Sequence, residues 1–133
     1  MKAVFVDTVG FLALWNAQDP YHEAAARALT ELARTGADLL TTAFILLECG
    51  NAASRTKFRK DVVEVRDHLD AQGKLIVPTD EDCKTAWSEY ERGIAGEAGI
   101  VDHVAFLVMR RLGIEDAFPN DRHFRIAGFN TLF

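Results

Sequence analysis

The chain has 133 residues, 49% hydrophobic and 26% charged, so we expect residues 1–133 to form one domain with a single core. It contains no apolar run of the roughly 18 residues that a membrane span requires, and no signal-peptide pattern follows Lys2, which together predict a cytoplasmic protein without membrane contact. The net charge of −5 argues against a strong overall electrostatic attraction to nucleic acid, although it allows local basic stripes.

Short strand-like segments alternate with helix-like segments along the chain. In chain order we expect a strand over 2–6, helices over 10–17 and 19–35, a strand over 38–41, helices over 43–56 and 58–72, a strand over 74–77, helices over 79–94 and 101–112, a strand over 114–118, a turn or helix over 121–126 and an edge strand over 130–133. This alternation predicts an α/β domain with a mainly parallel sheet of four to five strands.

Local signals set the expected helix ends. Asp19 and Pro20 are typical of a helix start, Gly36 of a helix end, and Thr42 of an N-cap. Thr79 followed by Asp82 resembles a capping box. The helical spacing of apolar residues in the next segment predicts that they form its inner face: Cys83, Ala86, Trp87, Tyr90 and Ile94. Cys49 and Cys83 lie far apart in apolar surroundings, and we expect two buried thiols rather than a disulfide.

Four carboxylates fall where the predicted strands end or the following helices begin. Asp7 follows the first strand and Asp121 the fourth, with Asp116 as a rival that falls inside the strand itself. Glu48 lies within the helix after the second strand, and Asp102 opens a later helix. Because ligands of open α/β sheets bind at the carboxyl ends of the strands, we expect these acids to share one edge.

Glu48 is the most informative of these acids, because it interrupts the apolar run 44–47 where a buried charge is costly unless paired. Asn51 and Arg55 lie on the same helical face. Four converging carboxylates would repel one another, and a divalent cation that prefers oxygen ligands, Mg²⁺ or Mn²⁺, would relieve that repulsion. Such a site suits hydrolysis of phosphodiester bonds.

Several short motifs then occur in a characteristic order over nearly the whole chain: Val6-Asp7-Thr8, Glu48 to Asn51, Val101-Asp102-His103, and Asn120 to Phe124 with Gly128-Phe129. In this the sequence resembles a PIN domain, and more closely the VapC-like toxin ribonucleases of type II toxin–antitoxin pairs. The resemblance implies a three-layer α/β/α fold, endonucleolytic cleavage of RNA, a homodimer and a small cognate antitoxin. It also implies that Mg²⁺ or Mn²⁺ is bound by Asp7, Glu48, Asp102 and Asp121.

Other polar residues near these motifs have two readings each. Thr8 orients Asp7 or binds a water, or it only begins a helix, and Asn51 supports Glu48 or faces a loop. Arg55 and Arg122 are candidate phosphate contacts, or ordinary surface residues. The neighbouring histidines, His103 and His123, are expected to be outer support or surface groups.

Residues 99–101 depart from the family pattern, because Gly99, Ile100 and Val101 occupy a stretch where Ser or Thr is frequent. This departure and the negative net charge motivate an alternative function, a non-catalytic PIN-fold module that binds RNA or protein. A DNA nuclease of the flap-cleaving kind is a weaker alternative, because the short chain lacks room for extra DNA-binding elements.

Overall fold

A computed structural model describes residues 2–119 and 121–133; Asn120 of the last motif lies outside the described residues. Its sheet has five strands, all paired in parallel, in the order β3-β2-β1-β4-β5. The strands are β1 (Ala3–Val6), β2 (Asp38–Thr42), β3 (Leu75–Ile76), β4 (Asp116–Phe118) and β5 (Asn130–Thr131). Val4, Phe5 and Val6 of the central strand are all buried, because helices cover both faces of the sheet.

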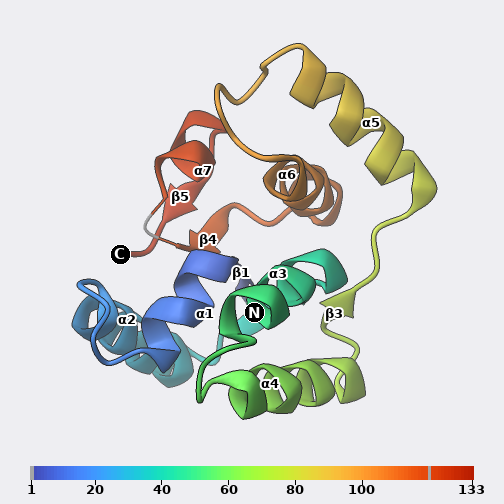
Figure 1. Ribbon diagram of the computed structural model, residues 1–133. Helices are drawn as coiled ribbons and strands as arrows, with labels where there is room; N and C mark the ends of the chain where they lie inside the picture. Colours follow the sequence, from blue (N-terminus) through green and yellow to red (C-terminus); the bar gives the residue numbers. More distant parts are fainter. Residues whose placement is uncertain (1, 120) are drawn as a thin grey trace.

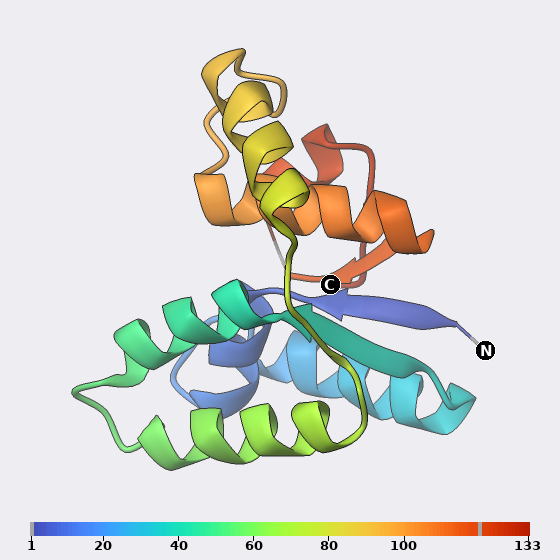
Figure 2. The ribbon, with the colours of Figure 1, turned by 90° about the vertical axis from the view of Figure 1, so that its right-hand side faces the viewer.

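The helices form two layers on the sheet (Figures 1 and 2). They are α1 (Thr8–Trp15), α2 (His22–Thr35), α3 (Ala43–Ala53), α4 (Arg59–Ala71), α5 (Asp80–Glu91), α6 (Ile100–Leu112) and α7 (Arg122–Ile126). Helices α1, α2 and α4 lie on one side, and α5, α6 and α7 on the other. The predicted three-layer α/β/α fold is confirmed. Within the described ranges, no helix combines the length and apolarity that crossing a bilayer would require.

The sequence signals for helix ends agree closely with the structure. The Thr42 hydroxyl accepts a hydrogen bond from the Ile45 amide at 3.1 Å, which caps α3. Thr79 and Asp82 form a complete capping box at the start of α5. Gly36 ends α2 with a φ of 71°, a left-handed conformation that glycine adopts readily.

Several predicted boundaries are wrong by two or three residues, and a local hydrogen bond explains two of them. Helix α2 begins at His22 rather than at Asp19, because the Asp19 carboxylate accepts a hydrogen bond from the Tyr21 amide and forms a turn before the helix. Helix α3 ends at Ala53 rather than near residue 56. There the Thr56 hydroxyl donates to the Ala53 carbonyl, a side-chain bond that competes with continued helix.

The expected inner face of α5 is only partly buried. Ala86 is fully buried, but Trp87 and Tyr90 are 56% and 48% exposed. Ile94, which is 49% exposed, lies beyond the helix, because α5 ends at Glu91 rather than at residue 94. Helix α5 packs mainly on α6 and is the outermost element on its side of the molecule (Figure 2), so only a narrow strip of its surface can be covered. Cys83 is likewise partly exposed, whereas Cys49 is buried; both are free thiols.

Helix α1 approaches β4 very closely at Gly10. A Cβ atom at this position would lie 1.9 Å from the Phe118 carbonyl oxygen and 2.8 Å from its ring. Glycine therefore lets the start of α1, with Asp7 and Thr8, lie directly beside the end of β4, from which the chain leads to Asp121.

Candidate active site

The central strand delivers Asp7 to the carboxyl edge of the sheet. Asp7 is the N-cap residue of α1 and is only 2% exposed. Its Oδ1 atom is buried and has no hydrogen-bond partner among the residues that the structure describes. A buried carboxylate oxygen without a donor is costly, so this atom is well suited to bind a cation.

Glu48 reaches the same place from α3. The Thr8 hydroxyl donates a hydrogen bond of 2.8 Å to Glu48 Oε1, so Thr8 orients Glu48 and not Asp7. The two residues are 40 positions apart, and no sequence pattern links them. Cys49, next to Glu48, is no candidate nucleophile, because burial raises the pKa of its thiol to about 12.

Asp102 and Asp121 come from the other side of the sheet. Asp102 lies in the first turn of α6, and Asp121 is the N-cap residue of α7, where its Oδ1 accepts a hydrogen bond from the His123 amide at 2.9 Å. Carboxylate oxygens of both acids and a ring nitrogen of His123 lie within 4.8 Å of one another. Of the two roles expected for His123, outer support or surface group, this position favours outer support.

These residues line one open cavity of about 620 Å³. Its walls are formed by Asp7, Thr8, Val9, Glu48, Asn51, Ala52, Asp102 and Asp121. The structure thus brings together the four predicted acids and the two predicted supporting residues. Arg55 and Arg122 are exposed and do not line the cavity, and Arg122 instead lies 3.8 Å from the Glu97 carboxylate.

Asp116, the rival of Asp121, lies elsewhere. It is buried at the start of β4, where its carboxylate contacts Lys2 Nζ at 2.7 Å and accepts a hydrogen bond from Asn130 at 3.0 Å. Burial opposes its ionisation, but these two partners lower the pKa of the Asp116 carboxyl below its ordinary value. Asp116 is therefore a paired structural acid.

The clustered acids are hard to ionise together. Burial first, and then the charge of Asp102, raises the pKa of Asp7 well above its ordinary value, with smaller contributions from Asp121 and Glu48. Burial, Asp121 and Glu48 raise the pKa of Asp102 to about 6, and His123 offsets part of this effect. A divalent cation would supply the missing positive charge, and a cavity with four carboxylates suits Mg²⁺ or Mn²⁺.

Cation binding is therefore expected to depend on pH. Protons compete with a cation for Asp102, so a pKa of about 6 predicts that Mn²⁺ affinity rises about tenfold between pH 5 and pH 7. Isothermal titration calorimetry at pH 5, 6 and 7 measures this, with Asp102→Asn as the control that should show a flatter profile. An affinity that does not change over this range would contradict the prediction.

Comparison with known proteins agrees with this geometry. The sequence matches the PIN domain family over residues 4–130. It is 31% identical to the 23S rRNA-specific endonuclease VapC20 of Mycobacterium tuberculosis, over 95% of each chain.

Solved structures show the same fold. The crystal structure of Mycobacterium tuberculosis VapC20, described as a Sarcin-Ricin loop cleaving toxin, superposes with a TM-score of 0.77 at 27% identity and 95% coverage of both chains. FitAcB from Neisseria gonorrhoeae, with a TM-score of 0.66, 13% identity and coverage of 98% and 96%, shares the fold. So does a structure of FitAB bound to a DNA fragment, with a TM-score of 0.72, 13% identity and coverage of 96% and 92%. The motifs, the three-layer fold and these similarities together show that this chain belongs to the PIN domain family.

Proposed function

We propose that this protein is a metal-dependent endoribonuclease and the toxin of a toxin–antitoxin pair. The observation that carries the proposal is the convergence of Asp7, Glu48, Asp102 and Asp121 in one cavity, with a buried Asp7 oxygen that lacks a partner. The similarity to VapC20 supports the same activity. We also propose that it acts in the cytoplasm, in keeping with an RNA substrate.

The four acids would hold Mg²⁺ or Mn²⁺, and the bound cation would supply an activated water and stabilise charge on the leaving oxygen. Thr8 fixes one oxygen of Glu48 and leaves the other for the cation. Asn51 lies in the cavity wall, where its amide can donate to a phosphate oxygen. The family resemblance implies that cleavage leaves a 3′-hydroxyl and a 5′-phosphate.

For the substrate, we propose an exposed loop of structured RNA, by analogy with the 23S rRNA specificity in the name of VapC20. Arg55 lies three positions after Ala52, and Arg122 directly follows Asp121, so each cation is close in sequence to a residue of the cavity wall. We propose that they bind phosphates on either side of the cleaved bond.

The test is cleavage of purified ribosomal RNA and of a matching hairpin with Mg²⁺ or Mn²⁺, with EDTA as the metal-free control. Metal-dependent cleavage that yields 5′-phosphate ends supports the proposal. If RNA is bound but never cut, and millimolar Mn²⁺ does not raise the melting temperature, the alternative of a non-catalytic PIN-fold module is favoured instead.

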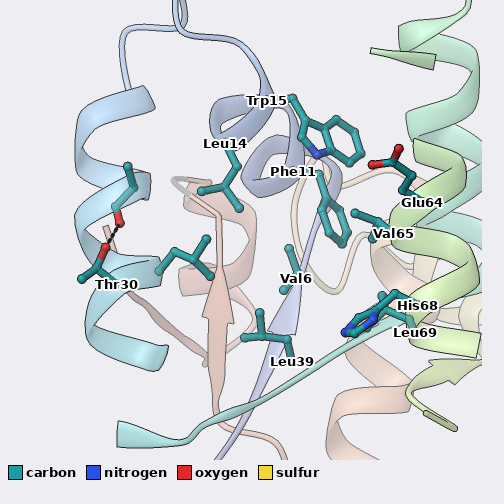
Figure 3. A pocket seen from close by; sticks show the side chains of 12 residues that line it. Val6, Phe11, Leu14, Trp15, Thr30, Leu39, Glu64, Val65, His68 and Leu69 are labelled. Atoms are coloured by element: carbon teal, nitrogen blue, oxygen red, sulfur yellow. Dashed lines mark hydrogen bonds between the residues drawn. The ribbon is translucent and has the colours of Figure 1, made fainter. Parts of the chain in front are cut away.

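A second cavity offers a place for the antitoxin. It has a volume of about 590 Å³ and lies between α1, α2 and α4 over the sheet (Figure 3). Its lining is mostly apolar: Val6, Phe11, Leu14, Trp15, Ala26, Leu29, Thr30, Leu39, Glu64, Val65, His68 and Leu69. Phe11 and Trp15 stack at 5.3 Å, and Glu64 and His68 are exposed on α4 at its edge. We propose that it binds an apolar helix of the antitoxin that carries a basic residue toward Glu64.

Leu29→Glu is expected to weaken antitoxin binding at least about 30-fold, because it places a charge in an apolar anchor pocket. Ribonuclease activity of the free toxin should stay unchanged, since Leu29 lies outside the acidic cavity. The measurement is co-purification and titration with the small protein encoded beside the toxin gene. Leu112→Glu, a charge on an exposed leucine elsewhere, is the control. Equal binding by both variants would exclude this cavity as the antitoxin site.

A further exposed apolar surface suggests how two copies associate. Leu47, Val63 and Val77 are 67%, 56% and 71% exposed and surround a groove of about 330 Å³ where α3, α4 and the edge strand β3 meet. We propose that this surface forms the homodimer interface. Sedimentation equilibrium at micromolar concentration should give the dimer mass for the natural protein and the monomer mass for Leu47→Glu. A monomeric natural protein would contradict the proposal.

A further inference from the structure

Two nitrogens of His123 lie close to a single oxygen of Asp121. Its backbone amide donates to Asp121 Oδ1 at 2.9 Å, and its ring Nδ1 lies 3.1 Å from the same atom. Both side chains are mostly covered, with 16% of Asp121 and 23% of His123 exposed. Because a carboxylate oxygen accepts hydrogen bonds, the contact is favourable when the facing ring nitrogen carries a proton.

This arrangement divides the two oxygens of Asp121 between two tasks. Oδ1 accepts a hydrogen bond from the backbone amide and lies 3.1 Å from the ring Nδ1 of the same residue, which restrains the carboxylate and leaves Oδ2 for another partner. His123 is not among the residues that line the cavity, and its other ring nitrogen, Nε2, is buried without a partner among the described residues.

We propose that His123 is a positioning residue that aims Asp121 at the cation. The inference rests on the proposed function, because it assumes that Asp121 is a metal ligand. Helix α7 has only five residues, so the backbone alone holds the Asp121 carboxylate by one amide bond. The imidazole supplies the second restraint, and hydrogen bonds of this outer kind typically change metal affinity about 10- to 100-fold.

Three variants distinguish the roles of the two ring nitrogens of His123. His123→Asn places an amide N–H close to the position of Nδ1, His123→Gln can place one only farther out, near Nε2, and His123→Leu has neither donor. We expect Mn²⁺ affinity, measured by calorimetry at pH 7.5, to fall at least tenfold for Leu and Gln and to stay within about threefold for Asn. The melting temperature in EDTA verifies that each variant is folded.

A second readout tests the rival role of direct ligand. Electron spin-echo spectroscopy of bound Mn²⁺ detects a coordinated ¹⁴N nucleus, and we expect no such coupling from His123. In an Asp121→Asn background, His123→Leu should cause no further loss of affinity, because the carboxylate that it orients is absent.

Several outcomes would overturn the inference: unchanged affinity in all three variants, equal loss in all three, recovery by Gln rather than Asn, or a ¹⁴N coupling that His123→Leu removes. These outcomes leave the proposed ribonuclease intact, since the natural protein still binds Mn²⁺. A natural protein that binds no Mn²⁺ would instead overturn the metal site itself, and this inference with it.

Discussion

Asp7→Asn protein is expected to cleave RNA more than about 100-fold more slowly than the natural protein, yet to melt at a higher temperature in EDTA. Loss of an outer hydrogen bond to a ligand already weakens a metal site about 10- to 100-fold, so loss of the buried ligand itself should exceed that range. The gain in stability has a separate cause. Asn removes a carboxylate that burial and three neighbouring acids make difficult to ionise.

The raised pKa of Asp7 also determines how the stability of the folded protein changes with pH. Because the pKa of Asp7 is higher in the folded protein than in the unfolded chain, folding is favoured most at pH values below the ordinary pKa near 3.8. That advantage is lost as pH rises through the folded-state value. In EDTA, the difference in melting temperature between Asp7→Asn and the natural protein should therefore widen from pH 5 to pH 8.

Differential scanning fluorimetry and an RNA cleavage assay measure both effects. With saturating Mn²⁺ the order should reverse, since mass action stabilises only the protein that binds the cation. Asp70→Asn, which removes an exposed carboxylate on α4, is the matched control and should change neither property. A lower melting temperature of Asp7→Asn in EDTA would show that Asp7 stabilises the fold and would contradict the electrostatic account.

Gly10→Ala is expected to lower the free energy of unfolding by about 3 kcal/mol. The added Cβ would overlap the Phe118 carbonyl oxygen, and a backbone atom in a central strand cannot rotate away as a flexible side chain can. Helix α1 would have to move away from β4, and Asp7 at its N-terminus would move relative to Asp121. A loss of this size is a large fraction of the 5–15 kcal/mol that holds a typical domain folded.

Urea denaturation measures the loss, and Mn²⁺ titration of the folded fraction reports whether the site is displaced. Gly50→Ala is the control, because Gly50 also lies within a helix but a Cβ there meets nothing within 4 Å. That substitution should be neutral or stabilise by up to about 1 kcal/mol. Equal stability of the two variants would mean that α1 can shift freely on the sheet.

Local chemistry explains which parts of this structure were predictable from the sequence. The capping box at Thr79 is a property of neighbouring residues, and it was identified correctly. Asp7 and Glu48 were predicted to lie at one edge of the sheet because each follows a predicted strand. Glu48 was also singled out because a charge within an apolar run is costly unless it is paired. The bond from Thr8 to Glu48 and the contact of His123 with Asp121 depend on side-chain geometry that no spacing rule gives.

The exposure of one face of α5 could not be predicted from the sequence, for a different reason. Helical periodicity predicted that Ala86, Trp87 and Tyr90 all face inward, but periodicity cannot tell how much protein lies opposite. Because α5 packs mainly on α6, Ala86 is buried and the larger side chains remain about half exposed. Coverage is decided by the packing of whole layers, which local sequence does not specify.

The pairing of strands that are distant in the sequence also affects when the acidic cluster can form during synthesis of the chain. Strand β1, synthesised first, pairs with β4 near the end of the chain, where Val4 lies opposite Asp116. Asp121 follows still later. A nascent chain on the ribosome therefore cannot complete the acidic cluster until Asp121 has left the exit tunnel, and such distant pairing is slow to form. We therefore expect the assembly of the acidic cluster to be a late step of folding.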